Sequence, residues 1–265
     1  MLINLPGRRL YYDLTGPENG PVVCFTHSLA SDSGMWAEQM APLLGAGYRV
    51  LRLDMRGHGG SDPVAGDYTM SALADDIALA LDFLKIDRVR LIGLSIGGMI
   101  GQAFAIAHGH RLVSAMLCDT APQTPPGAQA GWAPRIEAVK QVNSLAVLAD
   151  PTMDRWFTPA FKPRKPERWK EIHATIDGTT PAGYLGCSAA ILDFDFVTKL
   201  PTVKVPTLVV CGAGDEGTPP AGNKRIAELI PGGRYEEIAD ARHFPNVEQA
   251  ETFNRILMGW LEPNR

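Results

Sequence analysis

The stretch Gly93-Leu94-Ser95-Ile96-Gly97 decides how this chain folds. It follows an apolar run at residues 89–92 that is typical of a buried strand, and it precedes an apolar helical pattern at residues 99–107. Because a Cβ atom beside the serine would clash in so tight a strand-to-helix turn, the flanking glycines indicate a nucleophile elbow. Such an elbow would present the Ser95 hydroxyl at the end of a strand, beside the positive N-terminus of a helix.

Short apolar runs and helical patterns alternate around this elbow. The runs at residues 22–26, 48–53, 89–93, 113–118 and 207–211 are the strand candidates. They are continuously apolar, which indicates strands covered on both faces, and Leu73, Ile77 and Leu81 recur between two of them at helical spacing. We therefore predict an α/β fold with a mostly parallel central sheet flanked by helices. Residues 9–13 are expected to add an antiparallel strand at the sheet edge.

Residues 122–199 interrupt this alternation. They are rich in proline, show helical patches without a convincing buried strand, and include Trp132, Trp156 and Trp169, whose large side chains a cap over a cleft would bury. We predict one core domain, formed by residues 1–121 and 200–265, with a small helical cap at residues 122–199 inserted after the sixth strand. The basic, proline-containing run at residues 162–168 is interpreted as a solvated connector.

A serine hydroxyl is a poor nucleophile and needs a histidine base oriented by a carboxylate. After an elbow these groups follow in the order Ser, Asp, His. Asp215 directly follows the strand candidate at residues 207–211, and His243 lies in a loop before the last amphipathic helix. The predicted catalytic residues are therefore Ser95, Asp215 and His243.

Other acids and histidines have weaker contexts. Asp119 follows the strand candidate at residues 113–118 and could reach the same histidine from a neighbouring strand, and Glu216 adjoins Asp215. Both acids stay open as alternatives to Asp215. Of the remaining histidines, His27 and His58 are interpreted as structural and His108 and His110 as surface residues, and no motif supports a role for His173.

An oxyanion hole needs two backbone N–H groups directed at the oxygen of a tetrahedral intermediate. Ile96, which follows the nucleophile, supplies the first, and Leu29, in the loop after the strand at residues 22–26, is the predicted second donor. Chemistry of this kind uses no metal and no organic cofactor, so we expect neither.

Composition excludes several kinds of partner. The 265 residues are 45% hydrophobic and 20% charged, with a formal net charge of -4, as in soluble globular proteins. Nucleic acid and membranes are not expected to bind, because both attract basic proteins. We expect a cytoplasmic protein with a small-molecule substrate, either a monomer or a small homo-oligomer. Its cysteines are interpreted as buried free thiols: Cys24, Cys118, Cys187 and Cys211.

Several further stretches carry a family resemblance. They are His27-Ser-Leu-Ala, Leu53-Asp-Met-Arg-Gly-His-Gly-Gly-Ser61, Leu117-Cys-Asp-Thr-Ala121 and Arg155-Trp-Phe-Thr-Pro-Ala-Phe161. With the elbow, they make the whole chain resemble the α/β-hydrolase superfamily, and within it the 3-oxoadipate enol-lactonases and carboxylesterase-type hydrolases. The chain departs from the family pattern at Ser28, where many relatives have glycine, and at Arg242, where glycine or alanine is more usual. The Arg242 cation lies either near the pocket mouth or in solvent, and we expect it in solvent.

The resemblance implies an enzyme that hydrolyses a carboxylic ester or lactone through an acyl-enzyme, such as 3-oxoadipate enol-lactone. A lactone bearing a carboxylate would suit a cap arginine, for which Arg135 is the candidate and Arg155 the second choice. Ser28, Trp132 and Trp156 are the other candidate substrate-binding residues. A general carboxylesterase, a cofactor-free perhydrolase or haloperoxidase, a carbon–carbon bond hydrolase and a small-molecule receptor of hydrolase fold stay open as alternatives.

Overall fold

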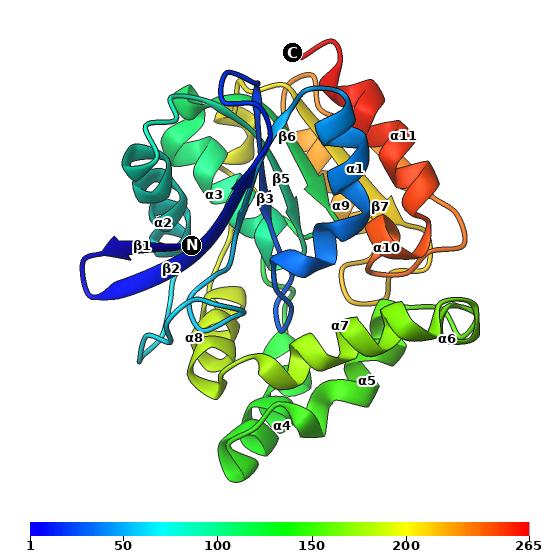
Figure 1. Ribbon diagram of the computed structural model, residues 1–265. Helices are drawn as coiled ribbons and strands as arrows, with labels where there is room; N and C mark the ends of the chain where they lie inside the picture. The colour runs from blue at the N-terminus through cyan, green and yellow to red at the C-terminus, as the bar shows by residue number, and fades with distance from the viewer. Residues whose placement is uncertain (265) are drawn as a thin grey trace.

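The computed structural model describes residues 1–264, and within them eight strands form one sheet (Figure 1). The order of the strands across the sheet is β1, β2, β4, β3, β5, β6, β7 and β8. Every neighbouring pair from β4 onward is parallel. The predicted mostly parallel sheet is therefore confirmed. In chain order the strands are β1 (Leu2–Leu5), β2 (Arg8–Thr15), β3 (Val22–Thr26), β4 (Arg49–Leu53), β5 (Val89–Leu94), β6 (Leu112–Cys118), β7 (Thr207–Gly212) and β8 (Arg234–Ile238).

The sheet edge differs from the prediction in one respect. The expected antiparallel strand at residues 9–13 is present as β2, but β1 pairs outside it, with Ile3 opposite Leu10. The prediction that this strand forms the edge is therefore wrong. The four residues of β1 alternate between buried and exposed, and so short an alternation gives a weak sequence signal.

Helices cover both faces of the sheet, as the continuously apolar strands predicted. Every residue of β3, β5 and β7 is buried. Leu73, Ile77 and Leu81, predicted from their helical spacing, are buried on α2. One face carries α1 (Ala37–Gly45) and α11 (Ala250–Leu261), and the other carries α2 (Met70–Phe83), α3 (Ile96–His108) and α9 (Pro220–Leu229) (Figure 1).

The cap lies between β6 and β7 in the chain and covers the end of the sheet where the parallel strands terminate (Figure 1). A β-bridge between Gln123 and Asp195 joins the two ends of this insertion. The predicted helical cap after the sixth strand is confirmed. Its helices are α4 (Ala128–Val142), α5 (Ala146–Trp156), α6 (Phe161–Arg164), α7 (Pro166–Gly178) and α8 (Pro181–Leu192).

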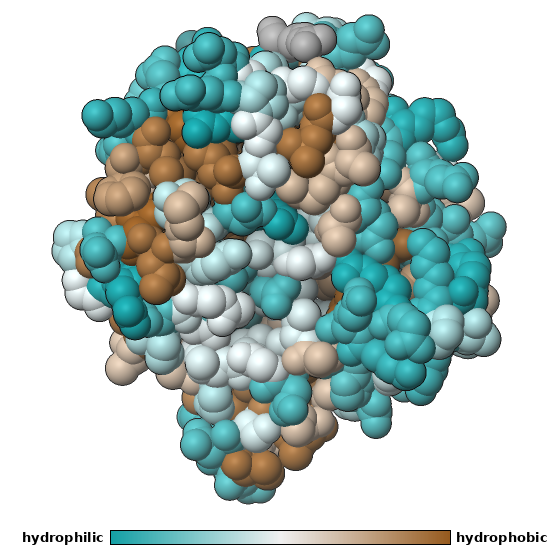
Figure 2. All heavy atoms as spheres, viewed as in Figure 1, coloured by the Kyte–Doolittle hydropathy of each residue, from teal (hydrophilic) through white to brown (hydrophobic). Residues whose placement is uncertain are grey.

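The basic run at residues 162–168 is more than a solvated connector, so that prediction is wrong. The surface over α6 and α7 is polar (Figure 2). Two arginines of the basic run nevertheless bind the core. Arg164 Nη2 donates to the Glu248 carbonyl oxygen at 2.6 Å. Arg168 pairs with the carboxylate of Glu38 on α1 at 2.8 Å and donates to the Gly34 carbonyl oxygen. These contacts tie the outer end of the cap to the core.

The three cap tryptophans have different surroundings. Trp156 is buried and stacks on Phe244 with ring centroids 4.2 Å apart. Trp132 is half-buried and lines the pocket described below. Trp169 stacks on His173 instead, with Lys162 Nζ 3.9 Å from its ring centroid. The expectation that the cap buries all three over a cleft is therefore wrong for Trp169.

The cysteines Cys24, Cys118, Cys187 and Cys211 are buried free thiols. Burial raises the pKa of Cys24 and that of Cys187 to about 12, so both stay protonated at neutral pH. Among residues 1–264, none of the helices combines the length and the apolar character that a membrane span requires.

Candidate active site

The elbow has the backbone strain that its sequence predicted. Ser95 has φ 60° and ψ −120°, a conformation that side-chain-bearing residues rarely adopt. A Cβ atom on Gly93 would lie 2.2 Å from the Gly97 carbonyl oxygen, and one on Gly97 would lie 2.5 Å from the Thr26 carbonyl oxygen. Glycine is therefore required at both positions for the chain to turn here.

Neighbouring strands hold this turn in place. The Ser95 amide donates to the Cys118 carbonyl oxygen at the end of β6, and Thr120 Oγ1 donates to the Ser95 carbonyl oxygen at 2.8 Å. On the other side, Thr26 Oγ1 at the end of β3 donates to the Gly97 carbonyl oxygen at 3.1 Å. The loops after β3 and β6 consequently start beside Ser95.

Asp215 and His243 form a buried hydrogen-bonded pair. Asp215 lies in the turn after β7 and accepts from His243 Nδ1 at 2.8 Å, and Asp215 is 3% and His243 6% exposed. Thr218 Oγ1 donates to the same carboxylate at 2.6 Å, and the Gly217 amide does so at 2.8 Å. Burial alone would raise the pKa of Asp215, but the charge and hydrogen bonds of His243 and Thr218 lower it below its usual value. A carboxylate thus fixes the Nδ1–H tautomer and leaves Nε2 as the acceptor nitrogen.

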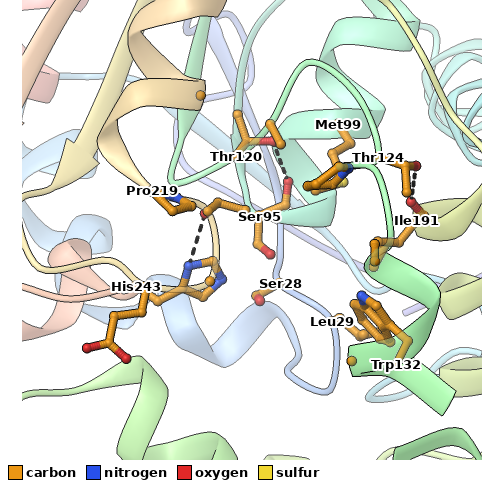
Figure 3. Close-up of a pocket in the computed structure, with 18 of the residues that line it drawn as sticks. Ser28, Leu29, Ser95, Met99, Thr120, Thr124, Trp132, Ile191, Pro219 and His243 are labelled. Carbon is orange, nitrogen blue, oxygen red and sulfur yellow. Dashed lines mark hydrogen bonds between the residues drawn. The ribbon is translucent and has the colours of Figure 1, made fainter.

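Ser95 and His243 line one pocket, although Asp215, the third predicted residue, lies behind the histidine. Figure 3 shows the side chains of Ser95, His243 and Ser28 converging on the same part of this pocket. The structure therefore brings the three predicted catalytic residues together from the ends of β5, β7 and β8, which are far apart in the sequence.

The alternative acids occupy different positions. Glu216 is exposed at the pocket rim. Asp119 is fully buried, and one oxygen each of Asp119 and Asp215 lies within 4.8 Å of a His243 ring nitrogen. Asp119 Oδ1 accepts from the Gly212 amide at 2.8 Å, whereas Oδ2 has no hydrogen-bond partner among residues 1–264. Burial and the charge of Asp215 raise the pKa of Asp119 well above its usual range, which favours the protonated form of its carboxyl group.

These three residues also form the one cluster with metal-ligand spacing in the described part of the chain. In this cluster His243 Nδ1 and Asp215 Oδ2 are already hydrogen-bonded to each other. The arrangement therefore suits a histidine base held by a carboxylate better than metal coordination.

The other histidines have structural partners or lie at the surface. His27 Nδ1 donates to the Ser28 carbonyl oxygen, and its Nε2 accepts from the Met55 amide at 2.9 Å. Burial and the neighbouring His27 lower the pKa of His58 to about 3, so this ring is neutral. His108 and His173 bind Asp75 and Asp150, away from Ser95.

The predicted oxyanion donors lie on the two segments next to Ser95. Ile96 is the first residue of α3, so its N–H has no acceptor one helical turn earlier. Leu29 lines the pocket together with Ser28 and Ser95, on the loop that follows β3. Both positions therefore suit backbone donation to an oxyanion formed at Ser95.

The pocket between the core and the cap has a volume of about 760 Å³ and a largely apolar lining. Such a volume accommodates a small organic molecule. All the predicted substrate-binding residues reach it: Ser28, Trp132, Arg135 and Trp156, together with the second-choice Arg155.

Two cap arginines give the pocket positive charge. Arg135 lies over the Trp132 ring, with its Cζ atom 5.5 Å from the ring centroid, and Arg155 donates to Thr152 Oγ1 at 3.0 Å. Neither forms an ion pair with a carboxylate within residues 1–264. Burial lowers the pKa of Arg155, and the charge of Arg135 lowers it further. The cap thus places two guanidinium groups where a bound anion could neutralise them.

Sequence reasoning missed several site residues. Thr218 binds both Asp215 and His243, and its position three residues after an aspartate in a turn is a signal that could have identified it. Tyr184 on α8 lines the pocket, and no sequence motif indicates it. Arg242 was expected in solvent, which is wrong, because its Nη1 donates to the carbonyl oxygens of Asp154 and Phe157 in the cap.

The fold and the arrangement of the site define the class of protein. A family profile for the alpha/beta hydrolase fold matches residues 21–250, so the chain belongs to the α/β-hydrolase family, as predicted. It is similar to 3-oxoadipate enol-lactonase 1 of Acinetobacter baylyi, at 33% identity over 99% of this chain and 96% of that relative. Its structure is similar to the enol-lactonase of Burkholderia xenovorans, with a TM-score of 0.93 and 35% identity over 98% of this chain and 99% of that one. A thermophilic esterase from Thermogutta terrifontis, solved with malate bound, matches with a TM-score of 0.90 and 30% identity over 99% and 97% of the two chains.

Proposed function

We propose that the protein is a serine hydrolase that opens a lactone bearing a carboxylate, with 3-oxoadipate enol-lactone as the specific candidate. One observation carries the proposal: Ser95 on its strained elbow shares a pocket with His243, whose Nδ1 is bonded to buried Asp215. Two features support the substrate class. The relatives include enol-lactonases, and the same pocket contains the guanidinium groups of Arg135 and Arg155.

Acylation follows from this geometry. His243 Nε2 takes the proton of the Ser95 hydroxyl as Oγ attacks the lactone carbonyl carbon, and the Asp215 carboxylate stabilises the imidazolium that forms. The negative charge that develops on the carbonyl oxygen is stabilised by the backbone N–H groups of Ile96 and Leu29. The ring C–O bond then breaks, and the whole substrate remains on Ser95 as an acyl-enzyme.

The leaving oxygen takes the proton held by His243. In an enol-lactone the protonated leaving group is an enol, which tautomerises to the more stable ketone and makes ring opening favourable. His243 next removes a proton from water, the hydroxide attacks the acyl-enzyme, and the proton returns to Ser95 Oγ. In the net reaction, one lactone and one water give one open-chain keto acid.

The cap arginines would select the substrate. A carboxylate on the lactone would accept hydrogen bonds from a guanidinium group, which is a stronger interaction than one between neutral groups. The malate in the related esterase structure is itself a dicarboxylate. The apolar remainder of the lining, which includes Trp132, Trp156 and Ile191, would cover the carbon chain of the substrate.

The test measures kcat/KM on 3-oxoadipate enol-lactone and on p-nitrophenyl butyrate in parallel, with Ser95→Ala as the blank. A preference for the lactone of several orders of magnitude, abolished in Ser95→Ala, is the expected result. Turnover of the neutral ester alone would replace the proposal by a general carboxylesterase. Activity that survives in Ser95→Ala would exclude the serine mechanism.

A further inference from the structure

The loop that contains His243 is bonded to the cap through residues on both sides of the histidine. The Phe244 amide donates to the Trp156 carbonyl oxygen at 3.3 Å, and the Phe244 ring stacks on the Trp156 ring. On the other side, the Arg242 side chain donates to the carbonyl oxygens of Asp154 and Phe157. These carbonyl groups lie at the C-terminus of α5, where a cation is favourably placed.

The carboxylate of Glu248 lies between these two segments. Glu248 is the last residue of α10 (Pro245–Glu248), which Figure 1 shows on the side of the core that faces the cap, and it is only 2% exposed. Its Oε1 accepts from the Thr158 amide at 2.9 Å and also from Thr158 Oγ1. Its Oε2 accepts from the Arg242 amide at 3.0 Å. One buried carboxylate thus joins the cap at Thr158 to the residue that precedes His243.

The core holds the opposite side of the same loop. The Gly214 amide, next to Asp215, donates to the Ala241 carbonyl oxygen at 2.9 Å. The His243 loop is therefore fixed between the turn that carries Asp215 and the cap segment that follows α5. Without Glu248, the Arg242 amide would lose its acceptor in a partly buried setting, and the loop would move to satisfy it.

We infer that Glu248 is a positioning residue for His243, which it holds against Asp215 by joining Thr158 of the cap to the Arg242 amide. This inference rests on the proposed function, because it takes His243 as the base. It also gives a physical role to the stretch Arg155–Phe161: its first two residues line the pocket, and Thr158 anchors the histidine loop. The contacts that hold the cap on the core therefore also position the His243 base.

The experiment uses the full chain and four variants, of which Thr158→Ser is the conservative replacement. Thr158→Val removes the hydroxyl donor while keeping the shape and the amide, and Glu248→Gln keeps the size but removes the charge and one acceptor oxygen. Arg168→Gln is the matched control, because it breaks the separate contact of the cap with Glu38 and touches no part of the His243 loop. For each, the melting temperature, kcat, KM and the downfield proton NMR signal of His243 Nδ1–H are measured.

The expected result is a fall in kcat of about ten- to a hundredfold in Thr158→Val and Glu248→Gln, as for other small displacements of a catalytic group. The His243 proton signal shifts or broadens in both variants, whereas Arg168→Gln changes neither kcat nor the signal. Thr158→Ser restores the wild-type values. Arg168→Gln is expected to lower the melting temperature alone. If Thr158→Val and Glu248→Gln also lower only the melting temperature, Glu248 has a structural role alone and the inference is overturned. The NMR signal needs no turnover, so it decides this question even if the proposed reaction is not observed.

Discussion

Asp215 Oδ2 accepts a hydrogen bond from His243 Nδ1 at 2.8 Å, and both side chains are almost completely buried. The Asp215–His243 hydrogen bond lies away from the pocket, whereas His243 itself lines the pocket together with Ser95. Three further donors satisfy the carboxylate: the Gly217 amide, the Thr218 amide and the Thr218 hydroxyl. The carboxylate is therefore oriented by hydrogen bonds to both of its oxygens before any substrate binds.

Asp215→Asn should lower kcat by a factor on the order of 10⁴, because an amide in this position favours the wrong imidazole tautomer. The fold should remain intact, since the amide oxygen can still accept from the backbone amides. Steady-state kinetics on an activated ester, with circular dichroism as the check on folding, measures the effect. A variant that keeps more than a tenth of the wild-type kcat would assign the role of Asp215 to another acid, of which Asp119 is the nearest.

Asp119→Asn should stabilise the protein increasingly as the pH rises. The folded-state pKa of Asp119 lies well above that of an unfolded aspartate, so folding must take up a proton at any pH between the two values. Wild-type stability therefore falls through this window, by at most about 1.4 kcal/mol per pH unit, and the asparagine variant lacks this loss. Urea unfolding at several pH values from 4 to 8 gives the difference. A constant difference across this range would show that Asp119 does not retain its proton.

Arg135→Gln and Arg155→Gln should each raise KM for a carboxylated lactone by about ten- to a hundredfold. This factor corresponds to the free energy lost with one charge-assisted hydrogen bond. KM for p-nitrophenyl butyrate should stay within twofold, because that ester carries no carboxylate. Equal losses on both substrates would mean that the arginines shape the pocket without binding the anion. Lys140→Gln on α4, outside the pocket lining, is the control for overall charge.

Gly97→Ala should abolish activity and lower the melting temperature, because its Cβ would lie 2.5 Å from the Thr26 carbonyl oxygen, a backbone atom that cannot move away freely. Gly259→Ala on α11 is the matched control, since its Cβ would contact nothing within 4 Å. That substitution should stabilise the protein by about 0.5–1 kcal/mol, as expected for alanine within a helix. Thermal unfolding and ester hydrolysis measured on both variants provide the comparison, and an active Gly97→Ala would show that the elbow can relax.

Those parts of the protein that depend on local sterics and periodicity could be predicted from its sequence. The glycines beside Ser95 follow from the tightness of one turn, and the parallel sheet follows from continuously apolar runs such as Val22–Thr26. Ser95 and Asp215 were predicted because each comes soon after a recognisable strand, and His243 was predicted from its place before the last amphipathic helix. The edge strand β1 was missed because four alternating residues carry little signal.

The folded structure is needed to establish which side chains meet. Because β6 and β7 are neighbours in the sheet, Asp119 and Asp215 both lie near the His243 ring. The structure shows that Asp215, and not Asp119, accepts the hydrogen bond from His243 Nδ1. It brings Arg135 and Arg155 to one pocket from two different helices, and it joins Glu248 to Thr158 across 90 residues of chain. These contacts depend on strand order and cap packing, which local sequence patterns do not encode, because the partners are far apart in the chain.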